Sequence, residues 1–244
     1  MPSSPRLVLV VNSGSSSLKF TVLGAAGGAP VVSGVAECLG LAEARIVFKA
    51  NGTKTVVELE RDDHTGALQA IFARLDAEGL LSRVAVVGHR VVHGAERFSE
   101  SAVITPEILA EIEACSPLAP LHNPANLIGI RAALEALPGV PQVAVFDTAF
   151  HQTMPRAASF YAVPMAWYRD HGVRRFGFHG TSHKYVAEHA AAALGAPVKD
   201  LKIVSVHLGN GASACAVMFG KSLESSMGLT PLEGLVMGTR SGDV

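Results

Sequence analysis

The sequence predicts an α/β protein in which a mixed sheet is flanked by helices and the opening domain is repeated in an incomplete second one. After the first sixty residues, strand patterns alternate with helical ones, and such alternation implies parallel crossovers and a helix-covered sheet. Segments 6–24 and 201–220 each consist of an apolar strand, a turn of Gly, Ser and Asn, and a second apolar strand. This repeat suggests a duplicated domain with a cleft between its halves, although two unrelated hairpins can share the same pattern.

The first sixty residues predict an antiparallel meander. Short apolar runs rich in Val, Ile, Thr and Phe alternate with Gly-rich or Asn-Gly stretches, which separate neighbouring strands. The expected strands are 6–12, 18–23, 30–39, 44–50 and 54–60.

The rest of the first domain, which we place at residues 1–147, combines helices with strands. Apolar residues recur at helical spacing in three segments and form short continuous runs in two others. The expected helices are 64–81, 106–115 and 123–137, and the expected strands are 84–92 and 142–147.

The second domain, residues 148–244, is expected to begin with a loop-rich stretch. A helix is predicted next, capped by Thr181 or Ser182 and ended by Gly195, and the second strand pair follows it. Segment 228–244 has no helix or capping signal, and a copy of the first domain would need further strands and helices. We therefore expect the chain to be truncated.

Composition excludes several classes of protein. The 20 basic and 21 acidic residues give a net charge of −1, which argues against a non-specific hold on nucleic acid or anionic membrane. The three cysteines are odd in number and lack CxxC spacing, so neither a disulfide framework nor a zinc site is indicated. The N-terminal apolar run is too short for a signal peptide, and no other segment approaches a membrane span. We expect a cytoplasmic protein with no nucleic-acid or membrane partner.

The turn Asn-Ser-Gly-Ser-Ser-Ser at residues 12–17 is suited to binding phosphate. Small residues let backbone N–H groups approach an oxyanion, serine hydroxyls add donors, and Lys19 supplies a nearby cation. The turn is not a Walker A motif, because a strand follows it rather than a helix. Ser/Gly turns that are merely solvated are common. The similar turn at residues 209–211 is therefore the main support for phosphate binding by residues 12–17.

Potentially reactive side chains gather at strand ends and in loops. A buried strand that ends in a charged residue is costly unless the charge is paired or solvated in a site. A shared ligand explains the set, although each residue alone has a structural explanation as well, as a core histidine, an ion pair or a turn former. The set comprises His89, Arg90, His93, His122, Asp147, Arg175, His179 and Arg240.

Seven motifs occur in the order found in the acetokinase family, and the resemblance extends from Leu7 to Val244. The motifs are VVNSGSSSLKF, GHRVVHGAERF, PLHNPAN, FDTAFHQTMP, RRFGFHGTSHKYV, HLGNGASACAV and GLTPLEGLVMGTRSGD. The resemblance implies two domains with a duplicated ribonuclease-H-like core, as in actin-like ATPases. It also implies ATP in the cleft, Mg²⁺ or Mn²⁺, and reversible transfer of the terminal phosphoryl group to acetate, giving acetyl phosphate and ADP.

The resemblance also implies roles for individual residues. Arg90 and Arg240 resemble the paired arginines that hold the acetate carboxylate and the transferring phosphoryl group. His179 resembles the histidine that donates to that group, His122 supports it, and Asp147 is similar to the aspartate that positions magnesium. The phosphate and metal contacts correspond to Asn12, Ser16, Lys19, His207, Gly209, Asn210 and Gly211, with Asn12 also touching the metal. The small pocket for the acetate methyl group corresponds to Val92, Leu121, Phe178 and Pro231.

This inventory suits phosphoryl transfer to a carboxylate. A carboxylate is already ionised at neutral pH, so the reaction needs no general base, and the difficulty is to bring two anions together. Positioning and charge neutralisation by arginines, a lysine, backbone donors and Mg²⁺ answer that difficulty.

One departure from the family limits the expected activity. The family continues with a Gly-rich adenosine-binding segment and a glutamate that helps hold magnesium, and neither is present here. We therefore expect this chain to be weakly active or inactive, and its unfinished sheet to expose apolar surface. The resemblance implies a homodimer but leaves the state of this fragment open.

Two other functions stay open. A propionate or butyrate kinase is one alternative, because an extra methylene in a small apolar pocket changes preference by only about 1 to 3 kcal/mol. A non-catalytic phosphate-binding fragment is the other. An Hsp70-like or actin-like assembly ATPase is disfavoured, because GHRVVHG and RRFGFHGTSHKYV have no use there.

Overall fold

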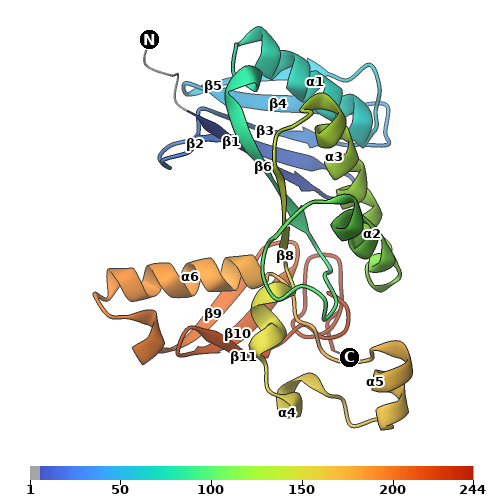
Figure 1. Cartoon of the computed structure of the whole chain (residues 1–244), viewed down its shortest axis with the longest axis vertical. Coiled ribbons are helices and arrows are strands. Elements are labelled where there is room, and N and C mark those ends of the chain that lie inside the picture. The colour runs from blue at the N-terminus through green and yellow to red at the C-terminus, as the bar shows by residue number, and fades with distance from the viewer. Residues whose placement is uncertain (1–5, 244) are drawn as a thin grey trace. The chain divides into compact units, whose positions relative to one another are not determined.

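The structure is a computed structural model that describes residues 6–243, so the predictions for residues 1–5 and 244 lie outside the described residues. The chain folds into two compact units (Figure 1). Unit 1 contains the described residues up to Val91, with Ala102–Ser116 and Pro120–Val145. Unit 2 contains Val92–Ser101, Pro117–Ala119 and the described residues from Phe146 onwards.

An eight-stranded sheet in the order β5-β4-β3-β2-β1-β6-β8-β7 forms the centre of unit 1. The first five strands pair antiparallel with their neighbours, which confirms the predicted meander. They are β1 (Leu7–Ser13), β2 (Leu18–Gly24), β3 (Val32–Glu37), β4 (Arg45–Ala50) and β5 (Thr53–Glu58). Strand β6 (Val84–Val91) then runs parallel to β1, as a crossover requires.

The remaining strands of this sheet are β7 (Ala102–Val103) and β8 (Gln142–Phe146), which pair antiparallel with each other. The sequence predicts β8 but not β7. A two-residue strand is too short to show the alternation that marks a strand in a sequence.

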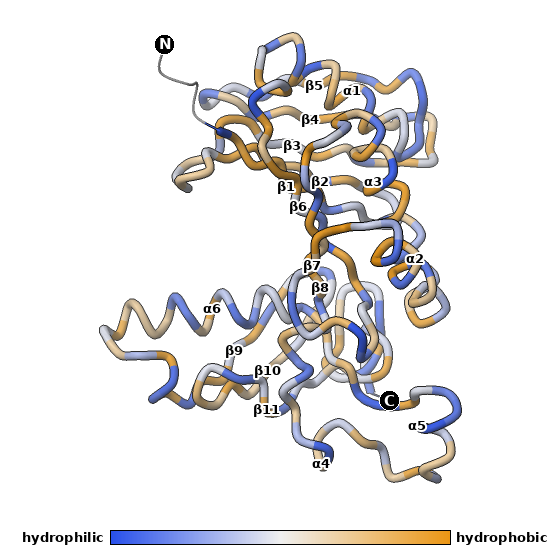
Figure 2. Tube along the Cα trace, in the orientation of Figure 1, coloured by the Kyte–Doolittle hydropathy of each residue, from blue (hydrophilic) through white to orange (hydrophobic). Residues whose placement is uncertain are grey.

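Helices α1 (His64–Ala77) and α3 (Asn123–Ala136) pack against each other, and α3 also contacts β1 and β6. The Asp63 side chain caps α1 by accepting from the backbone N–H of Gly66 at 2.7 Å. Alternate residues of β1, such as Leu7, Leu9 and Val11, are buried in one apolar core. Figure 2 shows the strands around β1 coloured mainly as hydrophobic. A further helix, α2 (Pro106–Ala114), packs on α3.

Unit 2 contains an antiparallel sheet in the order β11-β10-β9. Its strands are β9 (Lys202–Leu208), β10 (Ala212–Met218) and β11 (Lys221–Ser225). Three consecutive strands meander here as they do in β1, β2 and β3, so the repeat seen in the sequence has a counterpart in strand pairing. The predicted α/β class, with a mixed sheet and flanking helices, is confirmed.

Helix α6 (Gly180–Ala193) ends near Gly195 as predicted, and Gly195 has a left-handed φ of 64°. The predicted N-cap is wrong. Thr181 and Ser182 lie inside the helix, and the N-cap is His179, which has a φ of 57° and no side-chain capping bond. The reason is a tertiary contact: the N–H of Gly180 donates to the carbonyl oxygen of Asp147 at 2.9 Å, which fixes the start of the helix.

Short elements occupy the stretch that the sequence predicts to be loop-rich. They are the 3₁₀ turn η3 (Ala149–Thr153) and the helices α4 (Arg156–Ser159) and α5 (Met165–His171). Elsewhere in the described chain, 3₁₀ turns lie at η1 (Leu81–Arg83), η2 (Ser116–Leu118) and η4 (Val198–Asp200). Within residues 6–243, no helix has the length and apolar character that crossing a membrane requires.

One face of β9 is apolar and exposed. Val204, Val206 and Leu208 are 78%, 54% and 74% exposed. The alternating residues Ser205 and His207 point the other way and bond to side chains of α6. Strand β9 is therefore covered by α6 on one face and exposed on the other.

Burial makes histidine charge a determinant of stability. His89 on β6 hydrogen-bonds to Gln142 Oε1 at 2.6 Å, and desolvation lowers the pKa of His89 to about 4. The unfolded chain, in which the pKa is near 6.5, therefore binds the proton first, so stability is lost as pH falls from 6.5 towards 4. We expect the change His89→Gln, which keeps an N–H donor but has no charge, to reduce the loss of unfolding free energy between about pH 7 and about pH 5.5 by about 1 kcal/mol.

Urea unfolding monitored by circular dichroism measures this difference. Between about pH 8 and about pH 7 the two proteins should show nearly the same change in stability, because His89 is mostly neutral in both the folded and the unfolded state there. If the unfolding free energies of the two proteins also fell equally between about pH 7 and about pH 5.5, His89 would not be the cause of the loss of stability in acid.

Candidate active site

The first Gly/Ser turn joins β1 to β2, and it brings three predicted site residues together in unit 1. Asn12 and Lys19 face each other directly across the antiparallel pair. Arg90, on the neighbouring strand β6, donates from Nη1 to Asn12 Oδ1 at 3.2 Å. Ser16 lies at the exposed tip of the turn. A cation, a guanidinium and an amide therefore surround a turn of small residues, as anion binding requires.

Two side chains, those of His64 and Asn126, contact the backbone of this turn. His64 Nε2 lies 2.5 Å from the carbonyl oxygen of Gly14, and Asn126 Nδ2 donates to the carbonyl oxygen of Ser13 at 2.6 Å. Helix α3 also approaches β1 very closely, because a Cβ on Gly129 would lie 2.4 Å from Ser13 Oγ. The turn at residues 12–17 is therefore anchored by α3 and by the first residue of α1.

His122 and Leu121 stand at the start of α3. The carbonyl oxygen of His122 accepts from the N–H of Asn126, so His122 lies one helical turn before the residue that anchors Ser13. Leu121 is 73% exposed. The prediction that His122 directly precedes a helix is confirmed.

In unit 2 the second Gly/Asn turn joins β9 to β10. Gly209 N–H donates to the carbonyl oxygen of Gly211 at 3.0 Å, which closes the turn. Gly238, far along the chain, donates from its N–H to the carbonyl oxygen of Asn210 at 3.1 Å. The loop that carries Arg240 is therefore tied to the turn by its backbone.

Three of the predicted residues converge on Gly211. A Cβ built on Gly211 would lie 2.7 Å from Arg240 Nη2 and 3.2 Å from His179 Nε2. The ring of His207 stacks on that of His179 with centroids 4.0 Å apart. Only glycine leaves room for the guanidinium and the imidazole at this point.

Arg240 is positioned by its own loop. Its Nη1 donates to the carbonyl oxygen of Pro231 at 2.5 Å, which adds one further predicted residue, Pro231, to this group. Burial lowers the pKa of the Arg240 guanidinium from its ordinary value, yet a guanidinium stays charged at neutral pH. A partly desolvated cation interacts more strongly with an anion than one in bulk water does.

Asp147 follows β8 and is 2% exposed. Its carbonyl oxygen accepts from the N–H of Gly180, so Asp147 is adjacent to the residue after His179. This proximity joins the end of a strand to the start of α6, although 32 residues separate the two positions in the sequence.

The predicted apolar pocket is brought together in part. Val92 and Phe178 belong to one buried cluster with Ala119 and Met227. Leu121 belongs to unit 1 and lies outside that cluster.

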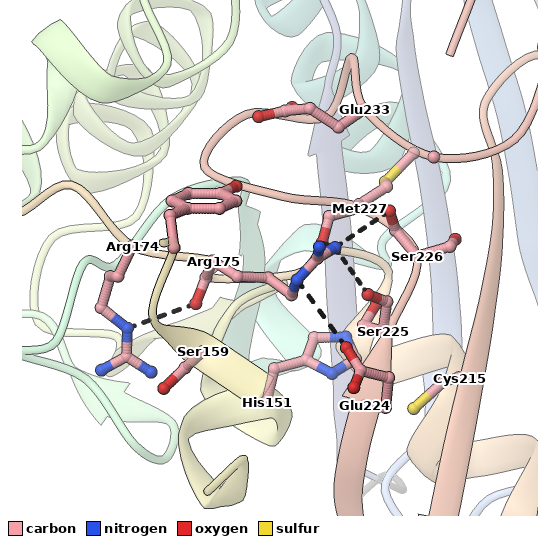
Figure 3. Close-up of polar contacts among 12 residues, drawn as sticks. His151, Ser159, Arg174, Arg175, Cys215, Glu224, Ser225, Ser226, Met227 and Glu233 are labelled. Carbon is pink, nitrogen blue, oxygen red and sulfur yellow. Dashed lines mark hydrogen bonds and ion pairs between the residues drawn. The ribbon is translucent and has the colours of Figure 1, made fainter. Parts of the chain in front are cut away.

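Arg175 supports the loop that carries the site rather than facing the Gly211 cluster. Its Nη1 donates to the carbonyl oxygens of Ser225, Ser226 and Met227 at 2.9, 3.2 and 3.2 Å (Figure 3). These residues lead directly into segment 228–240. The sequence places Arg175 among the ligand candidates, but its backbone partners lie about fifty residues away and leave no local signal.

Removal of the Arg175 guanidinium should loosen this loop. The change Arg175→Met leaves three carbonyl oxygens without their charged donor, and we expect the unfolding free energy to fall by about 2 kcal/mol. Arg131→Met is a matched control, because Arg131 forms an exposed pair with Glu113 and should cost less than about 1 kcal/mol. Equal midpoints of the two variants in urea would show that Arg175 is not a structural anchor.

The residues present fit a metal that arrives with the substrate. Among residues 6–243, no group of three or more His, Cys, Asp or Glu side chains could hold a metal ion by itself. Mg²⁺ commonly takes one or two carboxylates together with substrate phosphates and waters. Asp147 in unit 2 offers one carboxylate and Asn12 in unit 1 one amide oxygen. Each by itself suits a magnesium nucleotide better than a cage made only of protein ligands.

Known proteins resemble this chain over nearly its whole length. A family model described as the Acetokinase family matches residues 7–244. A relative from Deinococcus radiodurans, named acetate kinase, is 57% identical over 236 residues, which make up 97% of this chain and 59% of the relative. A second acetate kinase, from Chromobacterium violaceum, is 55% identical over 237 residues, or 97% of this chain and 60% of the relative.

Two solved structures also resemble this chain over nearly its whole length. A propionate kinase from Francisella tularensis superimposes with a TM-score of 0.94 at 46% identity, covering 98% of this chain and 62% of that one. Acetate kinase from Porphyromonas gingivalis gives a TM-score of 0.91 at 48% identity, covering 98% and 61%. The chain thus spans about three fifths of the length of the relatives it matches. Since the family model covers nearly all of its residues, the chain belongs to the acetokinase family.

Proposed function

We propose that the protein transfers the terminal phosphoryl group of ATP to acetate, giving acetyl phosphate and ADP, and catalyses the reverse reaction. The observation that carries this proposal is the convergence of His179 and Arg240 on Gly211 in unit 2. An imidazole and a guanidinium approach the one position of Gly211, which has no side chain of its own, and this suits a tetrahedral or planar phosphoryl anion. The names of the relatives favour acetate as the acceptor.

Each group has a role that follows from its charge. Arg240 and Arg90 neutralise the acetate carboxylate and the transferring phosphoryl group, and His179 donates a hydrogen bond to the latter, with His122 in support. A carboxylate oxygen of acetate forms the new bond to phosphorus while the bond to the bridging oxygen of ADP breaks, and ADP leaves with that electron pair. No proton needs to move.

The two glycine turns bind the nucleotide phosphates. In unit 1 the donors are Asn12, Ser16 and Lys19, and in unit 2 they are His207, Gly209, Asn210 and Gly211. When bound, Mg²⁺ neutralises charge on the phosphates, and Asn12 and Asp147 would hold it.

The acceptor pocket is built from apolar side chains. Val92 and Phe178 pack in one buried cluster of unit 2. We assign the acyl-binding role to these two residues, to Pro231 in the same unit and to Leu121 in unit 1. A pocket lined by such residues favours a short acyl group.

The domain division and the cellular setting also belong to this proposal. We propose that residues 1–147 form the first domain and residues 148–244 belong to the second, in a cytoplasmic enzyme without nucleic-acid or membrane partners. The chain spans about three fifths of the relatives' length.

A hydroxylamine trap for acyl phosphates tests the proposal. The protein is incubated with Mg-ATP and acetate, propionate or butyrate, beside the Arg240→Ala variant and the full-length Deinococcus radiodurans relative. We expect acetyl hydroxamate above the variant's background, with acetate preferred. A preference for propionate would instead assign a propionate kinase, and no product with any acid would leave a non-catalytic phosphate-binding protein.

A further inference from the structure

A line of buried hydrogen bonds leads from β9 to His179 within unit 2. Ser213 Oγ lies 2.8 Å from His179 Nδ1 and 2.8 Å from His183 Nε2. His183 Nδ1 lies 2.8 Å from Ser205 Oγ. His183, Ser205 and Ser213 are 1%, 3% and 0% exposed. Water has little access to this line, so its polar atoms must satisfy one another.

The hydrogens of this line can be placed by counting donors and acceptors. Ser205 Oγ has one hydrogen, and the only acceptor that the described structure offers to it is His183 Nδ1. Burial lowers the pKa of His183 to about 3, so the ring is neutral and has a single N–H. If Nδ1 accepts from Ser205, the N–H of His183 must be on Nε2.

The same counting continues to His179. His183 Nε2–H donates to Ser213 Oγ, so the single hydrogen of Ser213 is left to donate to His179 Nδ1. His179 Nδ1 is then an acceptor, and the proton of its neutral ring is on Nε2. If every hydrogen bond of the line ran the other way, the N–H of His183 would be on Nδ1. The buried hydrogen of Ser205 would then have no acceptor, which costs about 1 to 3 kcal/mol.

His179 Nε2 is the atom that faces the candidate site. It lies 3.2 Å from the position of a Cβ on Gly211, where Arg240 Nη2 also approaches. An N–H at this atom attracts an anion, whereas a lone pair would repel it. The direction of a hydrogen bond at Ser205 therefore decides which face His179 presents to the ligand.

We propose that Ser205, His183 and Ser213 are positioning residues that hold His179 in the tautomer with its proton on Nε2, ready to donate to the transferring phosphoryl group. The inference deepens the proposed function and rests on it. None of the three touches the substrate. They act through His179, as a buried hydrogen-bond chain that fixes both ring orientation and proton position.

Nitrogen-15 spectra of the histidine-labelled protein test this proposal without substrate or turnover. His179 is assigned by its absence from the His179→Gln variant. At neutral pH we expect His179 Nδ1 to resonate as an unprotonated nitrogen and Nε2 as a protonated one. In Ser213→Ala this separation should shrink as both tautomers become populated, whereas the matched control Ser222→Ala, whose hydroxyl bonds to His151, should leave it unchanged.

A second variant covers the case in which Ser213→Ala fails to fold. His183→Gln retains an N–H donor near the position of Nε2 and an acceptor for Ser205, so it should preserve the His179 tautomer, whereas His183→Leu should not. In the hydroxylamine trap, Ser213→Ala should lower kcat about tenfold with an unchanged KM for acetate.

Two spectroscopic results would overturn the proposal: a protonated Nδ1 on His179, or a tautomer that Ser213→Ala does not alter. A kcat unchanged by Ser213→Ala would overturn the positioning role as well. Failure of the proposed function would be seen separately, as no hydroxamate from the unsubstituted protein.

Discussion

Replacement of Arg240 by alanine is expected to lower kcat for acyl phosphate formation about a hundredfold, equivalent to about 3 kcal/mol of transition-state stabilisation. Arg240 approaches the space beside Gly211 with His179, and its loop holds it there through Pro231 and Asn210. Charge on the phosphoryl oxygens develops and spreads during transfer, so a preorganised cation acts mainly on the transition state. The hydroxylamine trap, run over a range of acetate and ATP concentrations, measures kcat and KM separately.

Two companion variants make this result specific. Arg240→Lys keeps the charge but loses the planar fork, so it should recover only part of the rate. Arg131→Ala removes an exposed arginine paired with Glu113 and should retain full activity. If Arg240→Ala raised KM and left kcat unchanged, Arg240 would contribute uniform binding only, and the assigned role in the transition state would be wrong.

Substitution of Gly180 by alanine is expected to lower the unfolding free energy by about 3 kcal/mol. A Cβ at this position would lie 2.3 Å from the carbonyl oxygen of Asp147 and 3.0 Å from Phe150 Cβ. The obstacle is backbone, which no side-chain rotation relieves, and the change also breaks the contact between Asp147 and the start of α6. Helix propensity alone predicts the opposite sign, because alanine is favoured over glycine by about 1 kcal/mol in a helix.

Gly88→Ala is the matched control for this substitution. A Cβ on Gly88 in strand β6 would meet nothing within 4 Å, so the change should alter stability by less than about 1 kcal/mol. Urea unfolding gives both values. Stabilisation of the protein by Gly180→Ala would mean that α6 shifts freely away from Asp147 and that their contact does not fix the helix start.

Local sequence patterns determine most of the strands and helices. The meander β1–β5 follows from apolar runs separated by stretches rich in glycine and asparagine, which are local signals. Helix α1 begins at His64 as its apolar spacing predicts, and the Asp63 side chain caps it through a bond to Gly66, three residues away. In the case of α6, the cap is set by Asp147, a residue outside the range of any local signal, so the sequence predicts Thr181 or Ser182 wrongly.

In the candidate site, too, some residues have a local sequence signal and others depend on tertiary contacts. The sequence identifies Asn12, Lys19, Arg90, His179 and Arg240, and the structure groups the first three in unit 1 and the last two in unit 2. Their supporting groups depend on tertiary contacts: Arg175 binds carbonyls about fifty residues away, and Ser205 is one of many serines in the chain. The helical spacing of His179 and His183 is the one sequence feature that could have revealed the buried chain of hydrogen bonds.

The synthesis of ATP from ADP and acetyl phosphate, followed by luciferase luminescence, is the most direct test of the proposed phosphoryl transfer. The measurement compares the protein with its Arg240→Ala and Gly88→Ala variants in the presence of Mg²⁺. We expect ATP formation that requires both substrates, falls about hundredfold in Arg240→Ala and is unchanged in Gly88→Ala. ATP formation equal in all three proteins, or none above heat-denatured protein, would contradict it.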